Sequence, residues 1–549
     1  MENSIDFMQL SALPTLASEE VVILAGTWLS PTADSDEEMR QIPQTWISAS
    51  SVCKAWRDIM WGRPIILAKM ICRHAAEFPA EFLHGPVEAL IRASRAGKVE
   101  IISCILKGQL EGYEACQADI LDGEALRAAA EGGHVEVVQL LLEWPHHAPR
   151  ADCKYGSALV MAASGGHVEV VQLLLEWPHH APLADCQNGS ALVMAASGGH
   201  VEVVQLLLEY PQHAPRADCQ GGSALVAAAR GGHMGMVKFL LGYPQQAPRA
   251  DCREGWALVE AARGGHMGVV QLLLEYPQHR PRADCQDGSA LVDAASRGHV
   301  EVVQLLLEYP QHAPRADCKD GSALVMAASG GHMEVVQLLL EYPKHAPRAD
   351  CQDGRALVAA VEGGHMGMVQ LLLEYPQHAP RADCQNSRAL VVAASRGHKG
   401  VVQLLLEWPQ SAPQADCQDG SALVRAAREG HTGVVQVLLE YPKNAPRADC
   451  QDGIALVEAA RGGHVDVVQF LLEYPQHAPR ADCQDGIALV EAARGGHVDV
   501  VQFLLECPQH APRADCQGGL AFAEAEIRGH EDVSQVFLKL RGHTPAAAL

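Results

Sequence analysis

The sequence predicts an all-α fold, a solenoid of about fourteen stacked repeats, and three observations lead to this prediction. Glycine recurs every 33 residues from Gly123 to Gly519, with Ser387 in its place once. A Gly-His pair keeps the same period, with its histidine at positions from His134 to His530. The chain has 549 residues, more than one hydrophobic core usually holds. A fixed period of this length is typical of units that pack only on their neighbours.

Each repeat is predicted to contain two short helices. In the unit that begins at Gly156, an apolar run predicts a first helix, and Ser157 is suited to cap its N-terminus. Two glycines end this helix because glycine readily adopts positive φ. A second helix is predicted from about His167 to Trp177, and Pro178 stops it. Its apolar residues lie on more than one face, which indicates burial between two neighbouring repeats.

The last repeat, residues 519–541, is predicted to cap the solenoid. Its second helix has Glu531 and Ser534 where the preceding repeat has Val498 and Val501. Polar residues at these two positions suit a terminal repeat whose outer face meets water. The solenoid as a whole is predicted to span residues 87–541, with residues 542–549 as a tail.

The period, the helix–Gly-His–helix plan and the Val-Val-Gln-Leu-Leu-Leu run resemble ankyrin repeats. One departure lies at the first helix, where Ser157-Ala158-Leu159-Val160 stands in place of the usual Thr-Pro-Leu-His. The resemblance implies that the Gly-His histidine ties one turn to the next through hydrogen bonds. We prefer this structural role to metal binding, and no metal site is expected.

The cysteines follow the same period. The chain has 17, and twelve of them occur once per repeat from Cys153 to Cys516. Equivalent points on stacked helices lie about 8–10 Å apart, which is too far for a disulfide. The same spacing disfavours a zinc site, whose ligands must converge on one ion. We therefore expect free, half-buried packing thiols in a reducing compartment.

Charge and hydropathy restrict the class of partner. The net charge is −24, so electrostatics oppose nucleic-acid binding, and no partner of that kind is expected. No stretch of eighteen apolar residues is present, and the N-terminus lacks a signal pattern. We expect no membrane association and a cytoplasmic or nuclear location, or both.

A few repeat positions vary freely while the framework barely changes. They are the first, fifth and eighth residues after the repeat glycine. The resemblance to ankyrin repeats implies that these positions face a concave groove, and a tryptophan beside an arginine is typical of a binding hot spot. The alternative is that they are solvent positions that tolerate change. The candidate groove residues are Trp256, Glu260, Arg263, Asp293, Arg297, Arg355, Arg388 and Arg425.

Residues 1–86 do not repeat. Apolar residues from Trp46 to Ile59 recur at three- and four-residue spacing, which predicts a helix in a small helical domain over residues 1–62, followed by a connecting segment over 63–86. The order of Leu13-Pro14, an apolar helix and the run from Ser51 to Ile59 resembles an F-box. The alternative is an ordinary helical cap for the solenoid. By resemblance, the adaptor-binding residues would be Leu13, Pro14, Val52, Cys53 and Trp56.

Together these features predict a non-catalytic protein-binding chain. The F-box resemblance implies the substrate-recognition subunit of a Skp–cullin–F-box-type ubiquitin ligase, in which a Skp-type adaptor binds the N-terminal domain and the repeats bind an unidentified target. The alternative is an ankyrin-repeat scaffold with no link to ubiquitination. No cofactor is expected. The sequence has no phosphate-binding loop, no His-Glu-x-x-His and no nucleophile elbow, so an enzyme is disfavoured.

Overall fold

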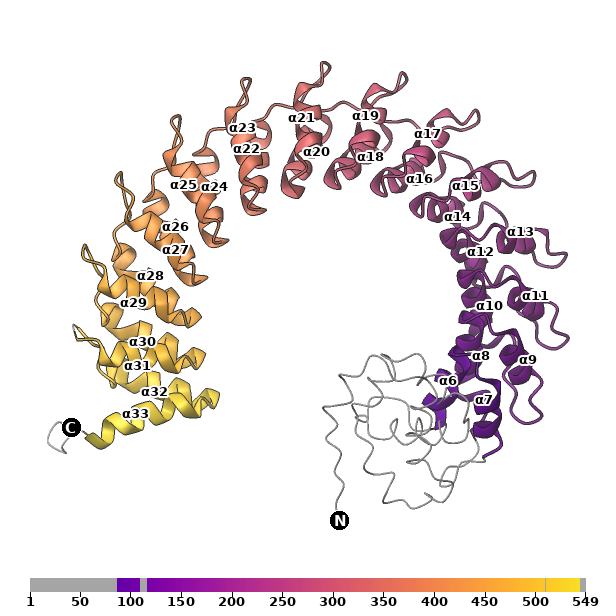
Figure 1. Cartoon of the computed structure of the whole chain (residues 1–549), viewed down its shortest axis with the longest axis horizontal. Coiled ribbons are helices and arrows are strands. Elements are labelled where there is room, and N and C mark those ends of the chain that lie inside the picture. The colour runs from indigo at the N-terminus through magenta and orange to yellow at the C-terminus, as the bar shows by residue number, and fades with distance from the viewer. Residues whose placement is uncertain (1–85, 109–115, 509, 544–549) are drawn as a thin grey trace, which may run out of the picture. The chain divides into compact units, whose positions relative to one another are not determined.

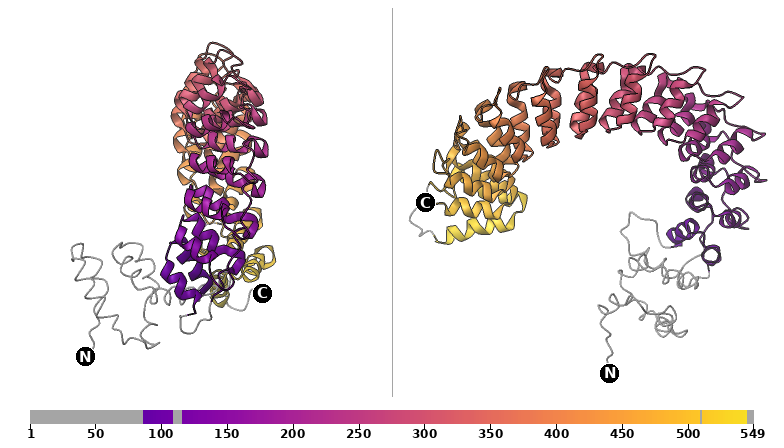
Figure 2. Two further views of the ribbon diagram at one scale, coloured as in Figure 1. Left: turned by 90° about the vertical axis from the view of Figure 1, so that its right-hand side faces the viewer. Right: turned by 45° about the horizontal axis from the view of Figure 1, so that its top comes forward.

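A computed structural model describes residues 86–108, 116–508 and 510–543 of the chain. This part of the chain forms 28 helices, α6 to α33, arranged as fourteen pairs, and it contains no strand. The all-helical solenoid predicted from the 33-residue period is therefore confirmed. The chain divides into two units at Arg249 and Ala250, and each unit is described by itself (Figures 1 and 2).

The first unit contains five helix pairs. Each first helix packs beside the first helices of its neighbours, as α10 does with α8 and α12. The bounds of its helices are α6 (Pro86–Arg95), α7 (Val99–Leu106), α8 (Ile120–Glu131), α9 (Val135–Leu142), α10 (Cys153–Gly165), α11 (Val168–Leu175), α12 (Cys186–Gly198), α13 (Val201–Glu209), α14 (Cys219–Arg230) and α15 (Met234–Leu241).

The second unit contains nine helix pairs. Its first helices are α16 (Cys252–Arg263), α18 (Cys285–Ser296), α20 (Cys318–Gly330), α22 (Cys351–Glu362), α24 (Cys384–Ser395), α26 (Cys417–Arg428), α28 (Cys450–Gly462), α30 (Cys483–Gly495) and α32 (Cys516–Arg528). Its second helices are α17 (Met267–Glu275), α19 (Val300–Glu308), α21 (Met333–Glu341), α23 (Met366–Glu374), α25 (Lys399–Glu407), α27 (Thr432–Leu439), α29 (Val465–Glu473), α31 (Val498–Glu506) and α33 (Glu531–His543).

The second unit is curved, and its two kinds of helix occupy different sides. In Figure 1, α16, α18, α20 and α22 lie on the inner side of the curve, while the loops between repeats project from the outer side. We call the nine first helices of this unit the inner row. A variable side chain on the inner row therefore faces a different environment from one on a loop.

The core runs between the two kinds of helix and between repeats. In the repeat that begins at Gly321, Leu324 of the first helix and Val336 and Leu339 of the second are fully buried. Alanines such as Ala327 leave room for the neighbouring first helix to approach closely. Burying a leucine or valine side chain stabilises the fold by about 1.5–3 kcal/mol. Because much of this burial occurs against neighbouring repeats, each repeat depends on the repeats on either side for its stability.

A left-handed turn precedes the regular part of each first helix. In α20, Lys319, Asp320 and Gly321 have φ values of 48°, 53° and 79°. A Cβ atom on Gly321 would lie 2.8 Å from the Sγ atom of Cys351 in the next repeat. The repeat glycine is therefore required both by its positive φ and by the thiol that packs against it.

The expected capping role of Ser157 is wrong. Ser157 lies inside α10, and its buried hydroxyl has no hydrogen-bond partner among the described residues. In other repeats the equivalent hydroxyl donates to the carbonyl three residues earlier, as Ser322 Oγ does to Lys319 over 2.7 Å. A left-handed turn precedes both serines and places each of them after the start of its helix, where neither can act as the N-cap.

The second helix of the same repeat is shorter than expected. The sequence predicts a helix from about His167 to Trp177, whereas α11 begins at Val168 and ends at Leu175. The residue before a proline is disfavoured in helical geometry, which explains why Trp177 lies outside the helix. In the described part of the chain, no helix is long and apolar enough to cross a membrane.

The terminal repeat is polar at only some of the expected positions. Glu531 and Lys539 are exposed, but Ser534 is 4% exposed and packs inside the repeat. Ser534 does not face water because Val533 and Phe537, which are also buried, place that side of α33 against the repeat. The prediction that Ser534 marks a water-facing surface is therefore wrong.

Candidate functional site

The repeats are held in register by histidine side chains. His332 Nε2 donates to the carbonyl oxygen of Ser296 in the preceding repeat over 3.1 Å. The same bond is made by twelve histidines at 2.9–3.2 Å, which confirms the structural role implied for the Gly-His pair. The ring of His332 also fills the space where a Cβ atom on Gly298 would lie. These histidines are thus engaged by the framework.

Two further bonds between repeats were not predicted from the sequence. Gln352 Nε2 donates to the carbonyl oxygen of Asp320 over 3.1 Å, one repeat earlier. Tyr342 donates its hydroxyl to the carbonyl oxygen of Leu307 over 2.5 Å. The signal was present in the sequence, because a glutamine follows most repeat cysteines and a tyrosine precedes the proline of most repeats. Both side chains rigidify the stack.

The repeat cysteines serve the same framework. Among the described residues, no cysteine forms a disulfide. Burial raises the pKa of Cys285, Cys318 and Cys351 to about 11. A thiol with such a pKa carries almost no thiolate near neutral pH, so these side chains are poor nucleophiles and poor metal ligands.

Most loop arginines are paired. Arg348 donates two hydrogen bonds to Asp350, at 2.8 and 2.7 Å, and this pair recurs in nine loops. The bond from Arg348 lowers the pKa of Asp350 below its ordinary value. These exposed pairs contribute little stability, but each one neutralises an arginine on the loop edge.

Four of the eight predicted groove residues form one cluster on α16 and α18. Arg263 donates from Nη1 to Glu260 Oε1 over 2.9 Å and from Nη2 to Asp293 Oδ2 over 2.9 Å. Its guanidinium carbon lies 5.9 Å from the centroid of the Trp256 ring. Glu260 is 2% exposed, so the carboxylate that orients Arg263 is itself fixed. We call these four residues the Trp256 cluster.

The other four predicted residues behave differently. Arg297, Arg355, Arg388 and Arg425 are exposed. None of them forms an ion pair with a residue that the structure describes, and Arg355 has only a 3.5 Å contact with the amide oxygen of Gln352. The structure therefore divides the predicted groove into an internally bonded cluster and a set of uncompensated arginines.

A series of ion pairs joins the first helices of the last repeats of the inner row. Glu491 is 7% exposed and accepts from Arg461 Nε over 3.0 Å and from Arg494 Nη1 over 2.5 Å. Arg461 also bonds Glu458, and Arg494 also bonds Glu524. The sequence showed that these positions vary, but not that the substitutions pair across neighbouring helices.

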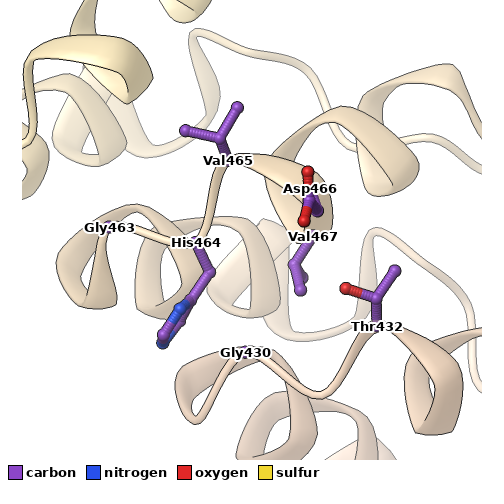
Figure 3. Close-up of a pocket in the computed structure, with 7 residues that line it drawn as sticks. All are labelled: Gly430, Thr432, Gly463, His464, Val465, Asp466 and Val467. Carbon is purple, nitrogen blue, oxygen red and sulfur yellow. The ribbon is translucent and has the colours of Figure 1, made fainter. Parts of the chain in front are cut away.

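One hollow of about 270 Å³ lies at the N-terminal ends of α27 and α29 (Figure 3). The imidazole of His464 is bonded to the carbonyl oxygen of Arg428 at 2.9 Å, so it is not available to a ligand. Pockets for small molecules are commonly about 300–1,000 Å³ and mostly apolar, and this hollow lacks those properties. Its lining residues are Gly430, Thr432, Gly463, His464, Val465, Asp466 and Val467.

The predicted adaptor-binding residues lie outside the described part of the chain. They are Leu13, Pro14, Val52, Cys53 and Trp56. Their interpretation therefore rests on the sequence alone.

Comparison with known proteins gives one family. A family model that describes three consecutive ankyrin repeats matches the chain in overlapping segments. The matched residues are 90–182, 178–251, 245–317, 311–385, 377–452, 423–517 and 456–545. These matches cover most of the chain, and no F-box model matches. No curated protein matches the sequence. The period, the paired helices, the histidine bonds and the extent of the match lead to one conclusion: the chain belongs to the ankyrin-repeat family.

Proposed function

We propose that the inner row of residues 250–543 captures a protein target and that the Trp256 cluster supplies the main contact on that surface. Ankyrin repeats bind protein partners and are generally non-catalytic. The observation that supports the proposal is that Trp256 and Asp293 occur in no other repeat at their positions and that both contact Arg263 on the inner side. A rigid frame with a local group of unusual side chains suits recognition of one partner.

The chemistry of the cluster suits a protein surface. Trp256 is half-buried and Arg263 stands over its ring, so both present a face whose position is already fixed. Tryptophan and arginine are enriched among residues that dominate binding energy. Because Glu260 and Asp293 hold the guanidinium, little side-chain entropy is lost when a partner binds.

Photo-cross-linking in cells tests this proposal. A photoreactive amino acid is placed at residue 256 on the inner row or, as a control, at Gln304, which is exposed on second helix α19. We expect a discrete cross-linked protein from position 256 and none from position 304. A variant with Asp293→Ala should reduce the cross-link, because Arg263 loses one of its two anchors. Identical products from both positions would contradict the proposal.

We propose further that residues 1–62 recruit a Skp-type adaptor, which would make the chain the substrate-recognition subunit of a cullin-type ubiquitin ligase. The support is the order of Leu13-Pro14, an apolar run and the segment from Ser51 to Ile59. A pull-down of purified adaptor with the full chain tests it, beside a Val52→Ala/Trp56→Ala variant. Binding that the variant loses supports the ligase role. If the folded full chain does not bind, the chain is an ankyrin-repeat scaffold.

A further inference from the structure

Three uncompensated arginines lie on consecutive helices of the inner row. Arg355 belongs to α22, Arg388 to α24 and Arg425 to α26, and all three side chains are exposed. In the described part of the chain, none of them has an acidic partner within ion-pair distance. We call these three residues the arginine row.

The neighbouring inner-row arginines show that pairing is the rule in this chain. Arg263 is bonded to Asp293, Arg461 to Glu491 and Arg494 to Glu524. The sequence has 66 acidic residues and 42 arginines and lysines, so potential partners are abundant. Three successive first-helix arginines without an acidic partner therefore form a local exception to this pairing.

The acidic groups around the arginine row are mostly engaged elsewhere. Glu362 at the end of α22 accepts from Arg396 over 2.7 Å. Glu458 on the next first helix is bonded to Arg461 over 2.6 Å. Asp353 and Asp419 are exposed in the left-handed turns and form no ion pair with the three arginines. The guanidinium groups of these three arginines are therefore exposed to solvent. Each guanidinium can donate two parallel N–H hydrogen bonds to one carboxylate.

The spacing of the arginine row indicates the form of its ligand. Arg355 and Arg388 occupy the same position in adjacent repeats, whose helix axes are about 8–10 Å apart. Arg425 is four residues further along its helix, which adds about 6 Å of rise. A peptide in polyproline II conformation has three residues per turn and advances about 3.1 Å per residue, so every third side chain points to the same side and would meet the next arginine.

We propose that the arginine row binds a segment of a protein partner in polyproline II conformation that carries aspartate or glutamate at about every third position. This inference rests on the proposed function, because it assumes that the inner row binds protein. It adds the chemistry of the bound segment. A polynucleotide is disfavoured, because the net charge of −24 repels a polyanion whose charge extends beyond three arginines.

Fluorescence anisotropy with the full chain tests the proposal. The probe is a labelled peptide with glutamate at every third position, separated by serine and glycine, and a matched peptide has the same residues with the glutamates contiguous. We expect the spaced peptide to bind more tightly, with an affinity that falls as salt is added. Equal binding of the two peptides, or no binding of either, would overturn the proposal.

Two variants with equal charge change identify the site. Arg355→Gln/Arg388→Gln/Arg425→Gln removes the arginine row, while Arg348→Gln/Arg381→Gln/Arg447→Gln removes three paired loop arginines. We expect about tenfold weaker binding for the first variant and less than about twofold for the second. An equal loss in both variants would reveal only non-specific attraction and would overturn the site.

Single substitutions protect the test against misfolding. Arg388→Gln should weaken binding, whereas Arg297→Gln, at another uncompensated arginine outside the row, should not.

A single-stranded oligonucleotide that binds more tightly than the spaced peptide and depends on the same arginines would assign the row to nucleic acid and overturn the protein proposal. If the peptide fails but cross-linking from position 256 succeeds, the proposed function stands and only this inference is wrong.

Discussion

Arg263 and Asp293 are 30 residues apart in the sequence, and a 2.9 Å hydrogen bond from Arg263 Nη2 to Asp293 Oδ2 joins their neighbouring repeats. The same guanidinium bonds the buried Glu260 within its own helix. One arginine therefore links two repeats and positions the face of Trp256. The Arg263 side chain therefore has two roles: it holds neighbouring repeats together and it forms part of the proposed binding surface.

This double role leads to an unequal effect of two substitutions. Asp293→Asn keeps Glu260 paired, so we expect the free energy of unfolding to fall by less than about 1 kcal/mol. Arg263→Ala removes a partner of a buried carboxylate, so we expect a fall of about 1–3 kcal/mol. Urea denaturation of both variants measures the difference. A larger effect from Asp293→Asn would contradict the anchoring role of Glu260.

The framework histidines should be distinguishable from the loop histidines by stability. His332→Ala removes the bond to the Ser296 carbonyl and the packing on Gly298, so we expect a loss of about 1–2 kcal/mol. His345→Ala, at an exposed loop tip, should change stability by less than about 0.5 kcal/mol. Hydrogen exchange at the Ser296 turn provides a local readout. Equal effects of the two substitutions would argue against the histidine ties.

The two requirements on the repeat glycine can be separated. Gly321 and Gly519 have φ values of 79° and 80°, but only Gly321 faces a cysteine of the next repeat, and nothing lies within 4 Å of a Cβ atom on Gly519. We expect Gly519→Ala to cost about 1 kcal/mol from backbone strain and Gly321→Ala to cost about 1–3 kcal/mol more.

A compensating substitution tests the cause of that difference. Cys351→Ala in the Gly321→Ala background should restore part of the stability, because it removes the thiol that the new methyl group would meet. The coupling is obtained from urea midpoints of the two single variants and the double variant. Additive effects would show that the thiol is not the obstacle.

The buried thiols predict a loss of stability in base. The thiol pKa of Cys285, Cys318 and Cys351 is raised by burial from 9.0 to about 11. An unfolded thiol therefore ionises first, so their contribution is complete below pH 9 and is lost as the pH rises to about 11. We expect the urea midpoint to fall across this window, and to fall less when the three residues are changed to serine. An equal slope in the serine variant would contradict the assignment.

The sequence was sufficient for the architecture, because the 33-residue period and the apolar positions of the two helices follow directly from packing. It was insufficient for the left-handed turn, since Lys319 and Asp320 carry no strong intrinsic preference for positive φ. The buried position of Ser534 was also missed, because polarity alone does not show which side of α33 a residue occupies.

The candidate groove was predicted as one set of variable residues. Distances were needed to separate Arg263, which is bonded to carboxylates, from Arg388, which is not. Variation among the repeats indicates that a side chain is not needed for packing between repeats. It does not show whether a charged side chain at that position forms an ion pair with the neighbouring repeat. That distinction decides which arginines can bind a partner.

The most direct test of target capture by the Trp256 cluster is the dissociation constant of the cross-linked target for the full chain and for its Trp256→Ala variant. We expect about tenfold or greater loss of affinity for Trp256→Ala, because a tryptophan in a contact surface commonly carries a large share of the binding energy. A control, Trp408→Tyr, places the usual tyrosine of the other repeats at a framework position and should leave affinity unchanged. Unchanged affinity of a folded Trp256→Ala variant would contradict a role of the Trp256 cluster in target binding.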